Sequence, residues 1–138
     1  MNLLDENIPL EQRDLLRARG VRCRVIGQDV ARLSISDEDI IALLHRLKRP
    51  TLFTRDEDFF KRDLCHPGYG RFWLDVAPEE AAMFILGLLR HPRFETNAGR
   101  MGIVARTHYD GVHFWQRQRP TLQCVRWLRP AGAAGGRK

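Results

Sequence analysis

Cysteine is scarce in this chain, and the cysteines that are present are not paired. The sequence has three, Cys23, Cys65 and Cys124, and no C-x-x-C motif. A disulfide scaffold or a structural zinc site needs paired thiols, so neither is expected. The five histidines also lack the spacing of metal ligands. We therefore predict reduced thiols and a cytoplasmic protein, in which any bound metal has oxygen ligands.

Long apolar runs and internal repeats are also absent. No stretch reaches the roughly 20 apolar residues of a membrane span, and Asp5 and Glu6 interrupt any signal-peptide pattern near the start. A chain of 138 residues can close one core without disulfides or metals. We expect a single domain over residues 1–129, no membrane partner, and a disordered tail at 130–138, where alanine and glycine dominate.

Acidic residues become rare after residue 89. Residues 1–89 contain 13 Lys/Arg and 15 Asp/Glu, a net charge of −2, whereas residues 90–138 contain 10 Lys/Arg and 2 acids, a net charge of +8. A basic segment beside clustered carboxylates suits a polyanionic substrate. The alternative is a solvated basic tail, and it is the better explanation for the last eight residues.

Short apolar stretches alternate with amphipathic ones, a pattern typical of α/β proteins. Strands are predicted at 2–4, 21–26, 51–53, 71–76, 102–108, 112–115 and 122–128. Helices are predicted at 9–19, 36–49, 59–64 and 79–90. Asp110-Gly111 has the composition of a tight turn between two strands, so we expect a C-terminal β-hairpin extension.

One stretch, residues 51–60, combines a buried-strand pattern with clustered acids. Thr51-Leu52-Phe53 is β-branched, aliphatic and aromatic, and Asp56, Glu57 and Asp58 follow it closely. Open α/β sheets bind their ligands at the carboxyl ends of the strands, so these acids are candidates for chemistry. The alternative is an acidic loop before a helix, because acids are favoured near helix N-termini.

Two further acidic clusters stand at equivalent places. Asp5 and Glu6 end the first predicted strand, and Asp37, Glu38 and Asp39 open the second predicted helix. If the strands at 2–4 and 51–53 are neighbours in a parallel sheet, all three clusters meet at its carboxyl edge. Clustered carboxylates repel one another unless a cation neutralises them. Mg²⁺ or Mn²⁺ is the natural occupant of a site with oxygen ligands only.

Three motifs, in their order and spacing, resemble those of the short PIN-like proteins, relatives of the VapC toxins. They are Leu4-Asp5-Glu6-Asn7-Ile8-Pro9, Ser36-Asp37-Glu38-Asp39-Ile40 and Thr54-Arg55-Asp56-Glu57-Asp58-Phe59. The resemblance covers residues 1–76, and nothing after residue 92 contributes to it. It implies a PIN-like three-layer α/β/α fold with a central, mostly parallel sheet, and a ribonuclease that depends on Mg²⁺ or Mn²⁺.

By position, the resemblance implies that Asp5, Asp56 and Asp58 are catalytic metal ligands. A further catalytic acid is Glu38, by its spacing to Asp56, or Asp37, by the Ser-Asp-Glu pattern, and both stay candidates. Asn7 is expected to support the ligands.

Contacts to RNA are expected from basic and aromatic side chains near the acids and in the basic segment. The candidates are Arg55, Arg106, Arg117, Arg119 and Trp115. For Arg55 the alternative is a salt bridge to Asp56 or Glu57, and for Trp115 it is a place in the core.

The leading hypothesis is thus an endoribonuclease, the toxin of a toxin–antitoxin pair, with RNA as substrate. A small antitoxin protein and a second copy of the chain are the protein partners it allows. The first alternative is a catalytically inactive PIN-like module that binds nucleic acid or protein. The second is another aspartate-based enzyme, a receiver-like phosphoacceptor or a haloacid-type phosphatase, although the chain has no D-x-D-x-T run.

Overall fold

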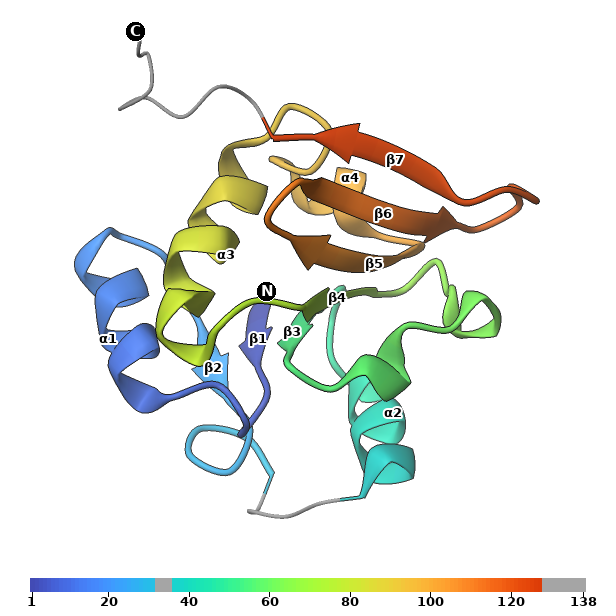
Figure 1. Ribbon diagram of the computed structural model, residues 1–138. Coiled ribbons are helices and arrows are strands. Elements are labelled where there is room, and N and C mark those ends of the chain that lie inside the picture. Colours follow the sequence, from blue (N-terminus) through green and yellow to red (C-terminus); the bar gives the residue numbers. More distant parts are fainter. Residues whose placement is uncertain (32–35, 128–138) are drawn as a thin grey trace, which may run out of the picture.

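One sheet of seven strands runs through the described part of the chain, residues 1–31 and 36–127 of the computed structural model (Figure 1). Its strands are β1 (Asn2–Leu4), β2 (Arg24–Val25), β3 (Thr51–Thr54), β4 (Gly70–Leu74), β5 (Ile103–His108), β6 (Gly111–Gln116) and β7 (Gln123–Arg126). They lie in the order β2-β1-β3-β4-β5-β6-β7. Neighbours from β2 to β5 are parallel, and β6 and β7 are antiparallel additions. The predicted α/β class and mostly parallel sheet are confirmed.

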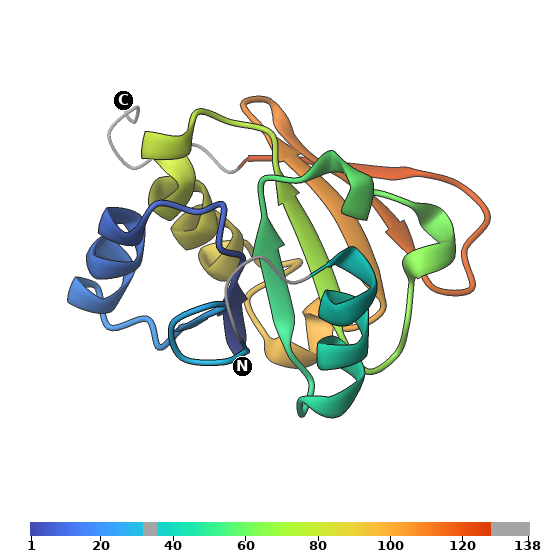
Figure 2. The ribbon, with the colours of Figure 1, turned by 90° about the horizontal axis from the view of Figure 1, so that it is seen from below.

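Helices cover both faces of the parallel part of the sheet (Figure 2). The helices α1 (Leu10–Ala18) and α3 (Ala81–Arg90) pack on one face, and α2 (Asp37–Arg46) packs on the other. Successive strand residues point to opposite faces, so Leu3 and Leu52 join the core under α2 while Leu4 and Phe53 join the core under α1 and α3. No helix in the described ranges is long and apolar enough to cross a membrane.

The helix α2 begins where the sequence predicts it. The Ser36 hydroxyl accepts a hydrogen bond from the Asp39 N–H at 3.2 Å, which satisfies one of the free donors of the first turn. The three acids of that turn, Asp37 among them, also favour a helix N-terminus. The helix ends at Arg46, three residues before the predicted end, because Leu47 is extended and Arg49 has a positive φ of 50°.

Several predicted elements differ from the structure in length or type. The strand predicted at 21–26 contracts to β2, and the Asp29 carboxylate accepts a hydrogen bond from the Val25 N–H in the turn that follows. The helix predicted at 59–64 is replaced by two 3₁₀ turns, η1 (Glu57–Phe59) and η2 (Arg62–Leu64). Another 3₁₀ turn, η3 (Pro78–Glu80), precedes α3, and the polar loop after α3 contains a short helix, α4 (Asn97–Arg100). The predicted tail at 130–138 and residues 32–35 of the predicted loop lie outside the described ranges.

Candidate metal site at the carboxyl ends of β1 and β3

The strands β1 and β3 lie side by side at the point where the chain changes direction within the sheet. From β1 the chain passes through α1 to β2, which lies on one side of β1. From β2 it passes through α2 to β3, which lies on the other side of β1. In open α/β sheets, ligands bind at such a point, outside the carboxyl ends of the two strands, and we call this region the crevice. Asp5 follows β1 and Asp56 follows β3, and the Asp5 N–H donates to the Phe53 carbonyl at 2.9 Å. Two of the predicted acidic clusters therefore lie at this crevice.

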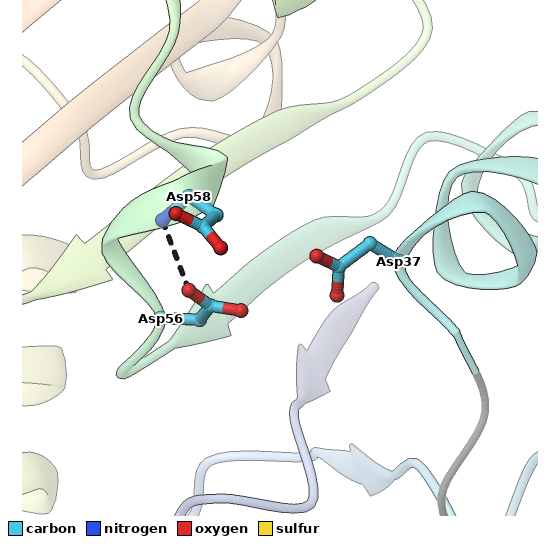
Figure 3. A group of neighbouring side chains, drawn as sticks. All are labelled: Asp37, Asp56 and Asp58. Carbon is cyan, nitrogen blue, oxygen red and sulfur yellow. Dashed lines mark hydrogen bonds between the residues drawn. The ribbon is translucent and has the colours of Figure 1, made fainter.

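Three carboxylates meet at the crevice (Figure 3). One oxygen from each of Asp37, Asp56 and Asp58 lies within 4.8 Å of the other two. Asp37 comes from the first turn of α2, and the other two come from the turn after β3. Asp37 and Asp58 are exposed and Asp56 is half-buried, so an ion from solvent has access to all three. This group of three aspartates could hold a metal ion.

The turn after β3 sets the relative positions of Asp56 and Asp58. The Asp56 side chain caps η1, because its Oδ1 accepts from the Asp58 N–H at 2.9 Å (Figure 3). The Asp56 N–H in turn donates to the Thr54 hydroxyl oxygen at 3.0 Å. This local geometry, which is too tight for an α-helix, directs both carboxylates toward Asp37.

Asp5, predicted as a metal ligand, is not part of this group of three among the described residues. Its side chain is only 4% exposed, and its oxygens accept from the Thr54 hydroxyl at 2.7 Å and the Glu6 N–H at 2.8 Å. Asn7 also donates to Asp5, at 3.4 Å, and its amide oxygen accepts from the Arg55 N–H at 3.0 Å. Asp5 and Asn7 thus hold the backbone that carries Asp56. The supporting role predicted for Asn7 matches these contacts, and Thr54 links Asp5 to the turn after β3.

Thr54 links Asp5 to the turn that carries Asp56, and the sequence analysis did not single it out. Its buried hydroxyl donates to Asp5 and accepts from the Asp56 N–H, so one oxygen joins the end of β1 to the turn after β3. The signal that points to it is its place at the end of a buried strand, directly before the acidic motif. A hydroxyl in that position has both a donor and an acceptor to contribute.

The electrostatics of the crevice oppose ionisation of two of its acids. Burial raises the pKa of Asp5, and the hydrogen bonds from Thr54 and Glu6 partly counter it. Burial, followed by the negative charges of Asp56 and Asp58, raises the pKa of Asp37. The native state therefore holds these protons more tightly than the unfolded chain, so their contribution to stability falls as pH rises from the ordinary aspartate range through the raised values. A bound cation would relieve this repulsion.

The structure separates the two candidates for the further acid. Asp37 belongs to the group of three, and Glu38 does not among the residues that the structure describes. Successive helix positions are rotated by about 100°, so only one of the two neighbours faces the crevice. The salt bridge considered for Arg55 is likewise not found within the described chain, where its half-buried side chain leaves Nε without a partner.

The residues predicted to contact RNA are distributed over several places. Arg106 pairs with Asp75 at 2.7 Å, and Trp115 lies under the Arg62 guanidinium at 5.6 Å. Arg117 and Arg119 are exposed after β6. The charge of Arg117 contributes to the lowered pKa of His66, and that of Arg119 to the lowered pKa of Arg93, after burial in both cases. These arginines therefore approach different parts of the chain.

Thr54→Val is expected to destabilise the protein by about 1–3 kcal/mol at neutral pH, because it leaves the buried Asp5 carboxylate without its closest donor. The same loss raises the pKa of Asp5 further, so the cost shrinks as pH falls and Asp5 becomes protonated. Urea unfolding at neutral and acidic pH measures both effects.

Thr107→Val is the matched control, because the Thr107 hydroxyl is equally buried but has no partner within the described residues. Its removal is expected to change stability by less than about 0.5 kcal/mol or to increase it. Equal losses for the two variants would show that Thr54 makes no special contribution to the site.

In comparisons with known proteins, no family model, curated protein or solved structure matches the chain.

Proposed function

We propose that this protein is a metal-dependent ribonuclease in which Asp37, Asp56 and Asp58 hold Mg²⁺ or Mn²⁺. The observation that carries the proposal is the meeting of three carboxylates, from α2 and from the turn after β3, at the carboxyl ends of two adjacent parallel strands. The resemblance to the PIN-like proteins supports the same reaction class. The basic C-terminal part of the chain suits a polyanionic substrate.

The donor set fits a hard divalent cation. Magnesium binds oxygen at 2.0–2.1 Å, so ligand oxygens on opposite sides of the ion are about 4.2 Å apart. The three aspartate oxygens lie within 4.8 Å of one another, close to this spacing, and the Asp37 and Asp58 side chains are exposed. No histidine or cysteine belongs to the group, which favours Mg²⁺ or Mn²⁺ over zinc.

The remaining residues of the crevice position these ligands. A bound divalent ion would supply an activated water and charge neutralisation for phosphodiester hydrolysis. Thr54 and Asn7 hold the backbone before Asp56, and the Asp56 side chain holds the N–H of Asp58. Arg55, whose Nε has no partner in the described ranges, is the cation closest in sequence to the group and is suited to a phosphate contact.

A catalytically inactive binding module is the second candidate. The observation that favours it is the state of Asp5, whose oxygens already accept hydrogen bonds from Thr54 and Glu6. That leaves three aspartates, fewer acids than the four that the resemblance implies for the active site. A module of this kind would bind RNA without hydrolysing it.

Cleavage of a generic single-stranded RNA in millimolar Mn²⁺, abolished by a chelator, is the expected result for the ribonuclease. Asp37→Asn is expected to lower the rate at least about a hundredfold, because a hard cation loses an anionic ligand. Glu38→Gln is the matched control, because it removes the same charge from a residue that is next to Asp37 but lies outside the group. This variant is expected to retain activity. Metal-independent cleavage, or equal loss in both variants, would refute the proposed site. Incorporation of a phosphoryl analogue instead would favour the phosphoacceptor.

The toxin role, the antitoxin partner and a homodimer stay predictions from the resemblance. A small antitoxin-like gene beside the gene for this chain is the observation that would support the first two.

A further inference from the structure

One row of side chains crosses the sheet from the acidic crevice to its far edge. Thr54 of β3 pairs in register with Trp73 of β4, Trp73 with Arg106 of β5, Arg106 with His113 of β6, and His113 with Cys124 of β7. Residues opposite one another on adjacent strands project from the same face. With about 4.8 Å between strands, the row is about 19 Å long. It begins at the hydroxyl that supports Asp56.

This face is partly exposed along the row, whereas Arg71 and Val104, two positions away on the same face, are fully buried. The α2 helix packs on the same face farther along the sheet, over a core that includes Leu3, Ile26 and Leu52 (Figure 2). In the row beyond Thr54, Trp73, Arg106 and His113 are partly exposed, and Cys124 is exposed. An antiparallel sheet often leaves one face solvated, but such a face is then mainly small and polar. Here it carries indole, imidazole and guanidinium groups.

Two tryptophans on this face are each covered by an arginine. The Arg106 guanidinium lies 5.5 Å from the Trp73 ring, and hydrogen bonds to Asp75 at 2.7 and 2.9 Å hold it there. The Arg62 guanidinium lies 5.6 Å from the Trp115 ring. Trp115 pairs with Val104, two residues along β5 from Arg106, so the two arginine–tryptophan pairs occupy adjacent rows.

Phe60 connects the pairs to the acidic group. Its ring lies 5.8 Å from the Trp73 ring, and it follows Asp58 by two residues. An aromatic surface therefore begins beside the three aspartates and continues across β4 to β6. Neither Phe60, Trp73 nor Arg62 is among the residues that the sequence predicted to contact RNA.

The chemistry of this face matches a single-stranded nucleic acid better than a protein. Unpaired bases stack on aromatic rings and on guanidinium planes, and arginines contact the phosphates between them. Arg62 and Arg106 supply positive charge at the two tryptophans, and Arg117 and Arg119 are exposed after β6. The large exposed apolar side chains that a protein partner would cover are mostly elsewhere, with Leu10 and Leu15 on α1 and Met83 on α3.

We propose that the exposed part of this face, around the Arg106–Trp73 and Arg62–Trp115 pairs, binds single-stranded RNA by stacking its bases over these pairs, and so leads the RNA strand to the three aspartates. The proposal rests on the proposed ribonuclease function and names how that site takes its substrate. A duplex does not fit the surface in this way, because its bases expose only their edges.

The test is the affinity for a fluorescent single-stranded RNA of about 12 nucleotides, measured by anisotropy in a chelator so that no metal-dependent cleavage occurs. Arg62→Gln with Arg106→Gln is expected to raise Kd at least about tenfold, because two stacking and phosphate contacts are lost. The matched control is Arg19→Gln with Arg90→Gln, two exposed arginines that line the groove between α1 and α3. It removes the same charge and is expected to change Kd less than about threefold.

Equal weakening by the two double variants, or tighter binding of duplex RNA than of the single strand, would overturn the proposal. Circular dichroism and thermal melting of each variant confirm that the comparison is made on folded protein. The outcomes separate the two proposals. A protein that binds as expected but never cleaves with Mn²⁺ contradicts the ribonuclease alone, whereas one that cleaves, with affinity unchanged by Arg62→Gln and Arg106→Gln, contradicts the binding face alone.

Discussion

Asp56→Asn is expected to remove most of the thermal stabilisation that millimolar Mn²⁺ gives the wild-type protein, and to lower RNA cleavage at least about a hundredfold. A ligand that binds only the native state at about 100 times its Kd stabilises it by about 2.7 kcal/mol, and the variant loses this as its affinity falls. Without metal, the variant is expected to be as stable as the wild type or slightly more stable. The reason is that the Asp56 charge contributes to the raised pKa values of Asp5 and Asp37.

Asparagine suits this test because it preserves the local structure. Its amide oxygen can still accept from the Asp58 N–H, as the Asp56 carboxylate does at 2.9 Å. Glu57→Gln is the control, since Glu57 is an exposed acid between the two ligands and lies outside the group of three. Melting temperatures with and without Mn²⁺ are compared for the three proteins. Equal metal-induced shifts in all three, or unfolding of Asp56→Asn without metal, would show that Asp56 is structural.

Proton competition gives this experiment a pH dependence. The pKa of Asp37 is raised by burial and by Asp56 and Asp58, and a metal binds only the ionised carboxylate. The Mn²⁺-induced shift of the wild type is therefore expected to shrink as pH falls from neutral toward the raised pKa.

Gly70→Ala is expected to destabilise the protein by about 3 kcal/mol or more, the largest stability effect that we predict. A Cβ at Gly70 would lie 2.2 Å from the carbonyl oxygen of Arg100. That carbonyl has little freedom to move, because the Arg100 side chain is buried and donates to the Thr51 hydroxyl at 3.0 Å and to the Phe94 carbonyl at 2.7 Å. The Gly70 N–H also donates to the Pro50 carbonyl, which holds the start of β4 beside β3.

The control for this variant is Gly68→Ala, two residues earlier in the same connection. Its added Cβ would approach only the imidazole of His66, at 3.1 Å, and a side chain there can rotate away. We expect it to cost less than about 1 kcal/mol. Urea unfolding of both variants is the measurement, and a small effect for Gly70→Ala would mean that α4 moves freely relative to β3 and β4.

Local sequence patterns were enough to place the acids but not to assign their roles. The strand before Asp5, the cap before Asp37 and the strand before Asp56 are all short-range features, and each was confirmed as an element. The choice between Asp37 and Glu38 depends on the rotation of α2 about its axis, which packing of Ile40, Leu43 and Leu44 on the sheet determines. Such a rotation depends on residues far away in the sequence.

The position of Asp5 outside the group of three also depends on residues far away in the sequence. In the sequence Asp5 and Asp56 look equivalent, as acids that follow buried strands. In the structure a hydroxyl from the neighbouring strand, Thr54, donates to Asp5 at 2.7 Å, and Asp5 is not part of the group of three. The pairing of β1 with β3 creates this contact between residues 49 positions apart, so no local sequence pattern predicts it.

The sequence by itself determined the α/β class, most of the element order, the hairpin near the C-terminus and the acidic crevice, because alternation of apolar residues, caps and turn residues are local and strong signals. Only the tertiary structure decided which acids meet and what lies beside them. The row from Thr54 through Trp73 and Arg106 to His113 joins four strands, and the register of β3, β4 and β5 comes from long-range pairing. That register is decided when the cores on the two faces of the sheet form together, since a shift of one residue would move every side chain of a strand to the opposite face.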